Sequence, residues 1–424
     1  MMKRFCGLLC LIALTVPLGA GTMKIIGTCD IHGRFRKFSG FVPLFKSFPD
    51  AVKVDLGDLI QGNVLSDVTD GALAVEVLNH LGFDLWVPGN HEFELGHALL
   101  AVRCREFRGR VLGGTQWRTK DFAPLAHAVI QRGKFRCGFI GLTESSMFEK
   151  SPLFAEFNFK DARDALREAV DSLKLQKCNA IVLLWHNGIR TPYGTLGQML
   201  WDFPEINAVI LAHSHKEVIS YVADRTLAIQ PDAHGRNAAL LTLEFCDETG
   251  KLKYVTGRLV SPAKFTDPAL EAVIRKSSSC YREFLAQKVC FVTSEKSFAA
   301  AAAQKLCRLA QSDLAVFDYP KLVCGSWDRF RLLASFPYRN RIFTVQVTAK
   351  EVKQFAAERV PAKRKRFICG MDKLRDDKIY TLALDDFQLF SSPTLRQKKN
   401  LARCRDIIGR EILYGLPETG RYLQ

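Results

Sequence analysis

Several patterns that would place this 424-residue chain in a special class are absent from it. No two cysteines are spaced Cys-x-x-Cys, which disfavours a thiolate zinc site and a redox pair. There is no repeat of fixed period, no low-complexity tract and, beyond the N-terminal segment, no stretch that resembles a membrane helix. With 48% hydrophobic and 25% charged residues, the composition is that of a folded globular protein, and the length predicts two or three domains.

Histidine is also scarce, and its placement is informative. Of nine histidines, five lie in a series of short segments rich in Asp, His, Asn and Gly. The segments are Asp30-Ile31-His32-Gly33, Gly57-Asp58, Gly89-Asn90-His91-Glu92, His186-Asn187-Gly188 and His213-Ser214-His215. We expect His80, His97 and His127 to be ordinary surface or core residues, whereas His234 could border a site formed by these segments.

Residues 1–21 have the layout of a secretory signal peptide. Lys3 and Arg4 precede a short apolar run, and small residues follow at positions 19–21. The run is too short to span a bilayer comfortably, although an uncleaved anchor is the alternative. We therefore expect an exported protein, periplasmic or extracellular, with no transmembrane segment in the mature chain.

The chain carries a formal net charge of +16, which favours anionic ligands. The densest basic run, residues 363–366, is expected to be a solvated loop; a contact with nucleic acid, anionic lipid or envelope polyanions is the alternative. No known nucleic-acid-binding module accompanies this run. We therefore expect no specific nucleic acid partner, and no protein partner is predicted.

The polar segments directly follow short apolar stretches, which we expect to be strands. These stretches are residues 24–28, 51–56, 85–87, 180–184 and 208–211. Helical spacing between some of them predicts an α/β fold, with helices at 38–48, 72–81 and 161–175. Because loops at the carboxyl ends of strands converge on one crevice, the polar segments should meet in space.

These segments supply the mixed imidazole and oxygen ligands that a pair of divalent cations needs. Asp30 and His32 can reach one ion, Asp58 is the natural bridge, and Asn90 offers an amide oxygen to the second ion. The remaining ligands are His186, His213 and His215. Nitrogen and oxygen ligands without thiolate suit manganese, zinc, iron or cobalt. His91 is left to stabilise charge on a phosphoryl group or to protonate the leaving oxygen, and Glu94 could orient it.

The same residues resemble the calcineurin-like metallophosphoesterases, and within them the bacterial 5′-nucleotidase and UDP-sugar hydrolase family. The matching stretches are Asp30-Ile31-His32-Gly33, Gly57-Asp58-Leu59-Ile60-Gln61-Gly62, Gly89-Asn90-His91-Glu92-Phe93-Glu94-Leu95-Gly96, His186-Asn187-Gly188 and Ala212-His213-Ser214-His215. The resemblance implies one metal bound by Asp30, His32, Asp58 and His215, and another bound by Asp58, Asn90, His186 and His213. It also implies a catalytic pair of His91 and Glu94, where the family usually has Asp in place of Glu94.

The second half of the chain resembles the family's C-terminal substrate domain more faintly. Pro337-Tyr338-Arg339-Asn340 is similar to the family's Pro-Phe-Gly-Asn motif, and residues 380–387 are similar to the strand that carries its second aromatic. The resemblance implies substrate binding by Tyr338, Asn340 and Phe387, with both aromatic rings packing in the core as the alternative. Two glycine-rich motifs of the family are missing, and Arg329 is the nearest substitute for the arginine of one of them.

The resemblance implies a four-layer metallophosphoesterase-type β-sandwich flanked by helices, with a smaller α+β C-terminal substrate domain. We expect a signal peptide (1–21), a dimetal phosphoesterase domain (22–262), a connecting helix (263–285) and a 5′-nucleotidase-like C-terminal domain (286–424). The expected function is hydrolysis of phosphate esters of nucleotides or related compounds by a hydroxide that bridges the two ions, with His91 assisting. The alternatives are hydrolysis of a lipid-linked diphosphate or a sulfur ester, and a surface-binding protein with a vestigial metal site.

Overall fold

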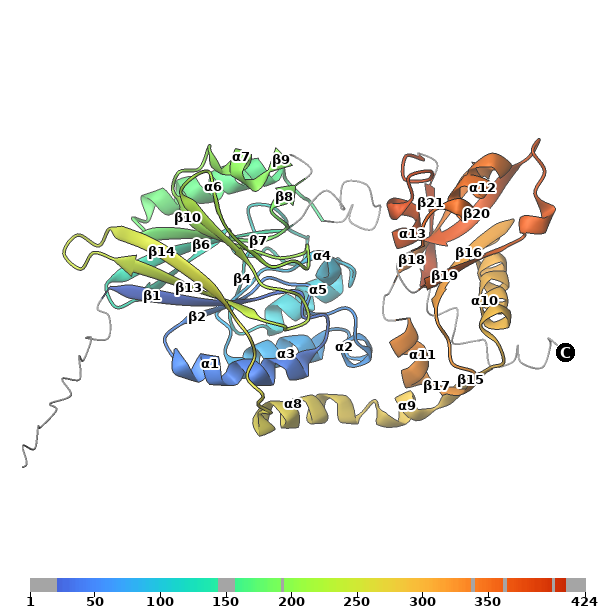
Figure 1. The fold of residues 1–424 in the computed structure, drawn as a ribbon, viewed down its shortest axis with the longest axis horizontal. Helices are drawn as coiled ribbons and strands as arrows, with labels where there is room; N and C mark the ends of the chain where they lie inside the picture. Colours follow the sequence, from blue (N-terminus) through green and yellow to red (C-terminus); the bar gives the residue numbers. More distant parts are fainter. Residues whose placement is uncertain are drawn as a thin grey trace, which may run out of the picture.

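The computed structural model describes residues 21–143, 157–191, 194–336, 340–360, 364–398 and 401–408. It shows two bodies joined by two consecutive helices (Figure 1). We call residues 22–260 the N-terminal unit and residues 288–408 the C-terminal unit. In the part of the chain that is described, no helix combines the length and the apolar character needed to cross a membrane. The predicted signal peptide lies outside the described residues, apart from Gly21.

Two six-stranded sheets form the centre of the N-terminal unit. The first contains, in spatial order, β14 (Leu252–Val260), β13 (Ala238–Phe245), β1 (Thr22–Thr28), β2 (Val52–Asp55), β3 (Leu85–Trp86) and β4 (Arg110–Val111). The second contains β11 (Val218–Val222), β12 (Thr226–Gln230), β10 (Ile206–Leu211), β7 (Ala180–His186), β6 (Phe135–Thr143) and β5 (His127–Arg132). The strands β1 to β4 are parallel, as are β6, β7, β10 and β12, so their carboxyl ends lie at one edge of each sheet.

Helices cover the outer faces of both sheets. The first sheet is covered by η1 (Phe35–Phe41), α1 (Val42–Ser47), α3 (Ala72–Leu81) and α5 (His97–Glu106), and the second by α6 (Ala162–Leu175) and α7 (Leu196–Leu200). Buried side chains such as Val54, Val182 and Ile210 fill the space between the sheets. This order of helix, sheet, sheet and helix confirms the predicted four-layer α/β architecture (Figure 1).

The predicted single connecting helix is wrong in one respect, because the segment forms two helices. They are α8 (Pro268–Ser279) and α9 (Arg282–Ala286). Serines end α8: the Ser278 hydroxyl donates to the Ile274 carbonyl at 2.7 Å, and such side-chain bonds compete with the helical backbone. Leu270 and Ile274 of α8 pack into the same core as α3, which anchors the linker to the N-terminal unit.

The C-terminal unit is a smaller α+β body built on a five-stranded sheet. Its strands, in spatial order, are β19 (Arg364–Cys369), β16 (Leu314–Pro320), β20 (Ile379–Asp385), β18 (Arg341–Thr348) and β21 (Leu401–Ile408). The helices are α10 (Glu295–Ala310), α11 (Arg329–Ser335), α12 (Ala349–Ala357) and α13 (Asp386–Ser391), with a separate pair of strands β15 (Lys288–Val292) and β17 (Gly325–Asp328). Phe387 was expected to continue a strand, but β20 ends before it and Phe387 lies in α13.

The expectation that the basic run 363–366 is a solvated loop is also wrong for its described residues. Arg364, Lys365 and Arg366 begin strand β19, and Lys363 lies outside the described residues. The Arg366 guanidinium forms two hydrogen bonds with the Asp318 carboxylate, at 2.9 and 3.0 Å, and Lys365 pairs with Glu295. Acidic partners on neighbouring elements therefore allow these basic residues to form part of a sheet.

Candidate metal centre

The polar segments meet at the carboxyl ends of the strands, as predicted from their order. Backbone bonds join the first two loops: the Asp30 N–H donates to the Gly57 carbonyl and the His32 N–H to the Asp58 carbonyl, both at 2.9 Å. The loop after β10 joins them, since the His213 N–H lies 3.0 and 3.1 Å from the two Asp30 carboxylate oxygens. The positions of the side chains are thus set by three strands from two different sheets.

Most of the predicted ligands have an unusual backbone conformation. Five of them have left-handed φ angles: Asp30 (50°), His32 (49°), Asp58 (50°), His213 (66°) and His215 (54°). Asp and His tolerate this region better than most residues, but non-glycine residues there still carry strain. Strain concentrated in this way is typical of functional sites, where the surrounding structure enforces it. The backbone therefore points to the same residues as the sequence motifs, on independent grounds.

The first group of side chains consists of Asp30, His32, Asp58 and His215. One potential ligand atom from each lies within 4.8 Å of the others. The Nε2 atoms of His32 and His215 are 3.1 Å apart, and His215 Nε2 lies 3.5 Å from Asp30 Oδ1. His32 Nε2 lies 3.9 Å from Asp58 Oδ2. This group is the one that the resemblance assigns to the first metal.

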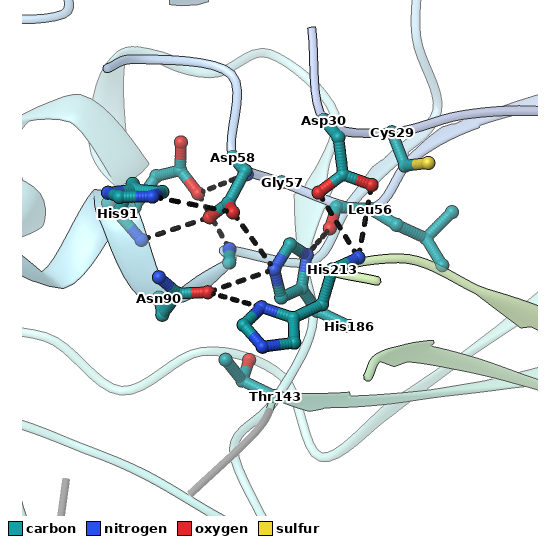
Figure 2. A network of polar contacts seen from close by, with 12 residues as sticks. Cys29, Asp30, Leu56, Gly57, Asp58, Asn90, His91, Thr143, His186 and His213 are labelled. Carbon is teal, nitrogen blue, oxygen red and sulfur yellow. Dashed lines mark hydrogen bonds and ion pairs between the residues drawn. The ribbon is translucent and has the colours of Figure 1, made fainter. Parts of the chain in front are cut away.

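The second group consists of Asp58, His186 and His213, again with ligand atoms within 4.8 Å of one another. Figure 2 shows Asn90 beside them: its Oδ1 lies 2.8 Å from His213 Nδ1 and 3.2 Å from His186 Nε2. His186 Nε2 is also 3.3 Å from Asp58 Oδ2. Asp58 belongs to both groups and lies between them, as a bridging carboxylate should.

The hydrogen bonds of two histidines show that the groups fit divalent cations. His186 Nδ1 faces the Leu56 carbonyl and His32 Nδ1 faces the Gln61 carbonyl, so these nitrogens carry the protons. The Nε2 lone pairs then point at the centre, where His186 meets the oxygens of Asp58 and Asn90. Lone pairs that face one another need a cation between them, and a backbone carbonyl on the other ring nitrogen is the usual support of a ligand histidine.

Electrostatics give His32 and Asp58 the protonation states that bind cations. Burial lowers the pKa of His32 to about 4, which keeps its imidazole neutral. Burial opposes ionisation of Asp58, but His186 and His91 outweigh it and hold the pKa of this carboxyl well below its usual range. Neutral imidazoles and ionised carboxylates are the protonation states that ligate metals. For His186, burial lowers the pKa, but Asp58 and Asp30 outweigh it and raise that pKa to about 9, so a cation bound here would take the place of the ring proton.

His91 and Glu94 form a close pair beside this centre. The Nδ1 atom of His91 lies 2.6 Å from Glu94 Oε1, so the longer side chain of Glu reaches the ring and orients it. The Gln61 amide also donates to the Glu94 carboxylate. The other ring nitrogen, Nε2, lies 3.9 Å from Asp58 Oδ2 and faces the centre. Burial alone would lower the pKa of His91, but Asp58 and Glu94 raise it well above its usual value, which favours a protonated ring.

Two supporting carboxylates were missed by the sequence reasoning. Glu92 accepts four backbone N–H groups, from Gly89 (2.6 Å), Asp58 (2.8 Å), Leu59 (2.8 Å) and Ile60 (3.0 Å), and so ties two ligand loops together. Asp55 accepts the Thr28 hydroxyl at 2.6 Å and the Gly57 N–H at 3.0 Å beneath the same loops. Glu92 lies inside the Gly-Asn-His-Glu motif, which was the available signal; for Asp55 the only signal was a charge at the end of an apolar strand.

Comparison with known proteins agrees with this geometry. Residues 23–217 match the family model of the calcineurin-like phosphoesterases. This segment is therefore a calcineurin-like phosphoesterase domain. The matched region includes each of the seven proposed ligands, from Asp30 to His215.

Relatives of this chain include a Homo sapiens 5′-nucleotidase, 28% identical over 61% of this chain and 53% of the relative. A 2′,3′-cyclic-nucleotide 2′-phosphodiesterase/3′-nucleotidase of Haemophilus influenzae is 23% identical over 63% of this chain and 51% of the relative. The chain thus spans about half the length of these relatives. The solved 5′-nucleotidase precursor of Thermus thermophilus has the same fold, with a TM-score of 0.69 at 16% identity over 94% of this chain and 96% of that chain.

The described residues among those predicted to bind substrate lie in the C-terminal unit. Tyr338 lies outside the described residues. The Asn340 side chain hydrogen-bonds to the Asp385 carboxylate. Phe387 is 54% exposed and lines a pocket of about 470 Å³. The Arg329 guanidinium lies 4.0 Å from the centre of the Phe284 ring in α9, so it contacts the linker.

Proposed function

We propose that this phosphoesterase is a metal-dependent hydrolase that cleaves phosphate esters of nucleotides or related small molecules. In this proposal the metal ligands are Asp30, His32, Asp58, Asn90, His186, His213 and His215. The N-terminal unit carries the reaction, and the C-terminal unit binds the rest of the substrate through Phe387, Asn340, Tyr338 or Arg329. The relatives named as nucleotidases support this class of substrate.

The observation that carries the proposal is the sharing of Asp58 by two complete ligand groups. The first group lies on the His32 and His215 side of Asp58, and the second on the His186 and His213 side. A vestigial site would be expected to have lost at least one ligand. Within the described residues every predicted ligand is present and near its partners, which favours an active centre over a vestigial one.

The protein's own residues have distinct tasks in the reaction. A pair of divalent ions, when bound, would polarise the phosphoryl group and supply a nucleophile at neutral pH. His91 presents Nε2 toward the centre, where its proton can pass to the leaving oxygen as the P–O bond breaks. Glu94 keeps the proton of Nδ1 in place and thereby fixes the ring orientation. Glu92 holds the loops that carry Asp58 and Asn90.

A substrate panel tests the proposal. The purified protein, loaded with manganese, should hydrolyse p-nitrophenyl phosphate and at least one of the nucleoside monophosphates, cyclic nucleotides or UDP-sugars. Turnover of a lipid-linked diphosphate or a sulfur ester alone would instead support the alternative ester. No turnover of any compound by protein with confirmed metal content would contradict the proposal.

We also propose that the protein is exported and that its N-terminal signal is removed near Ala20. The layout of residues 1–21 supports this. Mass spectrometry of the protein recovered from its native host should show a mature N-terminus close to residue 21. An intact Met1 in the recovered protein would contradict removal of the segment.

A further inference from the structure

The acid of the catalytic pair lies where the two units meet. Glu94 ends the short helix α4 (Asn90–Phe93), and its carboxylate faces His91 and Gln61, both from the N-terminal unit. Its main-chain carbonyl faces the other unit. The Nη2 of Arg341 donates to this carbonyl at 3.4 Å. Glu94 is therefore held from three sides, and one of them is the C-terminal unit.

The C-terminal unit fixes the backbone of Arg341, so that its side chain can reach Glu94. Arg341 is the first residue of β18, and its backbone N–H donates to Asp386 Oδ2, 3.2 Å away, at the start of α13. Arg341 therefore contacts Asp386 through its backbone N–H and Glu94 through its guanidinium, so it joins the start of α13 to the acid of the catalytic pair.

An apolar cluster docks the units in this arrangement. Val64, Leu285 and Leu333 are buried together, with Leu65, Val68 and Tyr281 packed against them. Val64 belongs to α2 (Val64–Val68), which follows the metal loop and Gln61, whereas Leu333 belongs to α11 of the C-terminal unit. The cluster brings the C-terminal unit against the chain that follows Asp58. The Arg341 contact therefore forms when the units are docked as they are here.

We propose that Arg341 is a positioning residue that completes the His91–Glu94 pair from the C-terminal unit. The inference rests on the proposed function. Glu has one more rotatable bond than the Asp usual at this position, so its carboxylate has more conformations to lose. By binding the main-chain carbonyl of Glu94, Arg341 fixes the backbone from which the Glu94 side chain extends. The Glu94 carboxylate then keeps the Nδ1 proton of His91, and Nε2 stays directed at the leaving oxygen.

The consequence is specific to proton donation. When the P–O bond breaks, the proton on His91 Nε2 moves to the leaving oxygen, which departs as a neutral alcohol and leaves a neutral imidazole. A leaving group that is a weak acid depends on this proton, whereas p-nitrophenolate departs readily without it. Loss of Arg341 should therefore slow the hydrolysis of phenyl phosphate far more than the hydrolysis of p-nitrophenyl phosphate.

The experiment measures kcat and KM for both substrates in the full-length, metal-loaded protein. We expect Arg341→Ala to lower kcat for phenyl phosphate by about 10-fold or more and for p-nitrophenyl phosphate by less than about 3-fold, with KM nearly unchanged. Arg341→Lys, which keeps a donor on a long side chain, should recover part of the loss. Arg375→Ala removes an exposed arginine of the same unit and should match the wild type.

Several results would overturn the inference. An equal fall in kcat for both substrates would indicate a general defect, and a change confined to KM would make Arg341 a substrate-binding residue. His91→Asn serves as the reference: if it depends on the leaving group and Arg341→Ala does not, Arg341 has no positioning role. If neither variant shows the dependence, the acid role and the inference fail together, while wild-type turnover still tests the proposed function separately.

Discussion

At the scale of single residues, the centre combines strain with an unusual density of polar contacts. Left-handed conformations of non-glycine residues cost on the order of 1–3 kcal/mol each, and five predicted ligands adopt them. The backbone bonds between the loops of Asp30 and Asp58 offset that cost. Asp and His are both metal ligands and tolerant of this conformation, so one choice of residue satisfies two requirements.

The shared carboxylate should be the most sensitive position. Asp58→Asn removes a negative charge from both ligand groups, so we expect a fall in kcat of at least about 1,000-fold and weaker metal binding. Manganese-dependent turnover of p-nitrophenyl phosphate and elemental analysis measure the two effects. Asp224→Asn changes an exposed aspartate in the turn between β11 and β12 and is the matched control. A full rate in Asp58→Asn would refute the site assignment.

The carboxylate of Glu92 should contribute mainly to the stability of the fold and not directly to the reaction. Glu92→Ala leaves four backbone N–H groups without their acceptor, and we expect the free energy of unfolding to fall by about 2–4 kcal/mol. Urea denaturation of the metal-free protein isolates this effect from ligand binding. Glu106→Ala removes an exposed carboxylate that pairs with Arg103 and should cost less than about 1 kcal/mol. Equal losses in the two variants would contradict a structural role for Glu92.

At the scale of elements, some helices form because of local sequence signals, whereas other elements depend on tertiary contacts. Residues 349–357 form a helix on a local signal, because Thr348 and Glu351 cap its start reciprocally. The linker helix is interrupted after Ser279, and Phe387 lies in a helix because Asp385 and Gln388 start one there. Residues 364–366 read as a loop by charge, yet Asp318 and Glu295 supply the partners that let them pair as a strand.

The cap of α13 leads to a pH-dependent stability. Burial raises the pKa of Asp385 to about 6, so folding favours the protonated carboxyl. Stability from this group is therefore highest below the ordinary pKa of about 4 and falls as the pH rises through about 6. Asn caps a helix about as well as Asp but does not titrate. Relative to the wild type, Asp385→Asn should gain about 1–3 kcal/mol between pH 4 and pH 7.

Urea denaturation across this pH range measures the difference. Asp372→Asn, an exposed aspartate in the same unit, serves as the control and should give curves parallel to those of the wild type. A constant difference between Asp385→Asn and the wild type at every pH would mean that Asp385 does not titrate in this range.

At the scale of the whole molecule, the ligand groups belong to the N-terminal unit, whereas Arg329 and Phe387 belong to the C-terminal unit. Metal should therefore stabilise the N-terminal unit selectively, since a ligand that binds only the folded form raises its stability by mass action. In calorimetry we expect chelation to lower the transition of the N-terminal unit by roughly 5–10 °C and to leave that of the C-terminal unit unchanged. In Asp58→Asn, chelation should have little effect. An equal shift of both transitions would argue against a metal centre confined to the N-terminal unit.

The sequence by itself determined the metal centre and the α/β architecture around it. Ligand chemistry needs particular side chains, and those side chains stand directly after apolar strands, so both are visible along the chain. Only the tertiary structure decided which residues from distant segments contact and stabilise one another. Glu92 binds backbone groups of distant loops, the linker helix breaks at Ser279, and Arg341 reaches Glu94 across 247 positions. These contacts depend on how packed elements approach each other, which no local pattern of residues specifies.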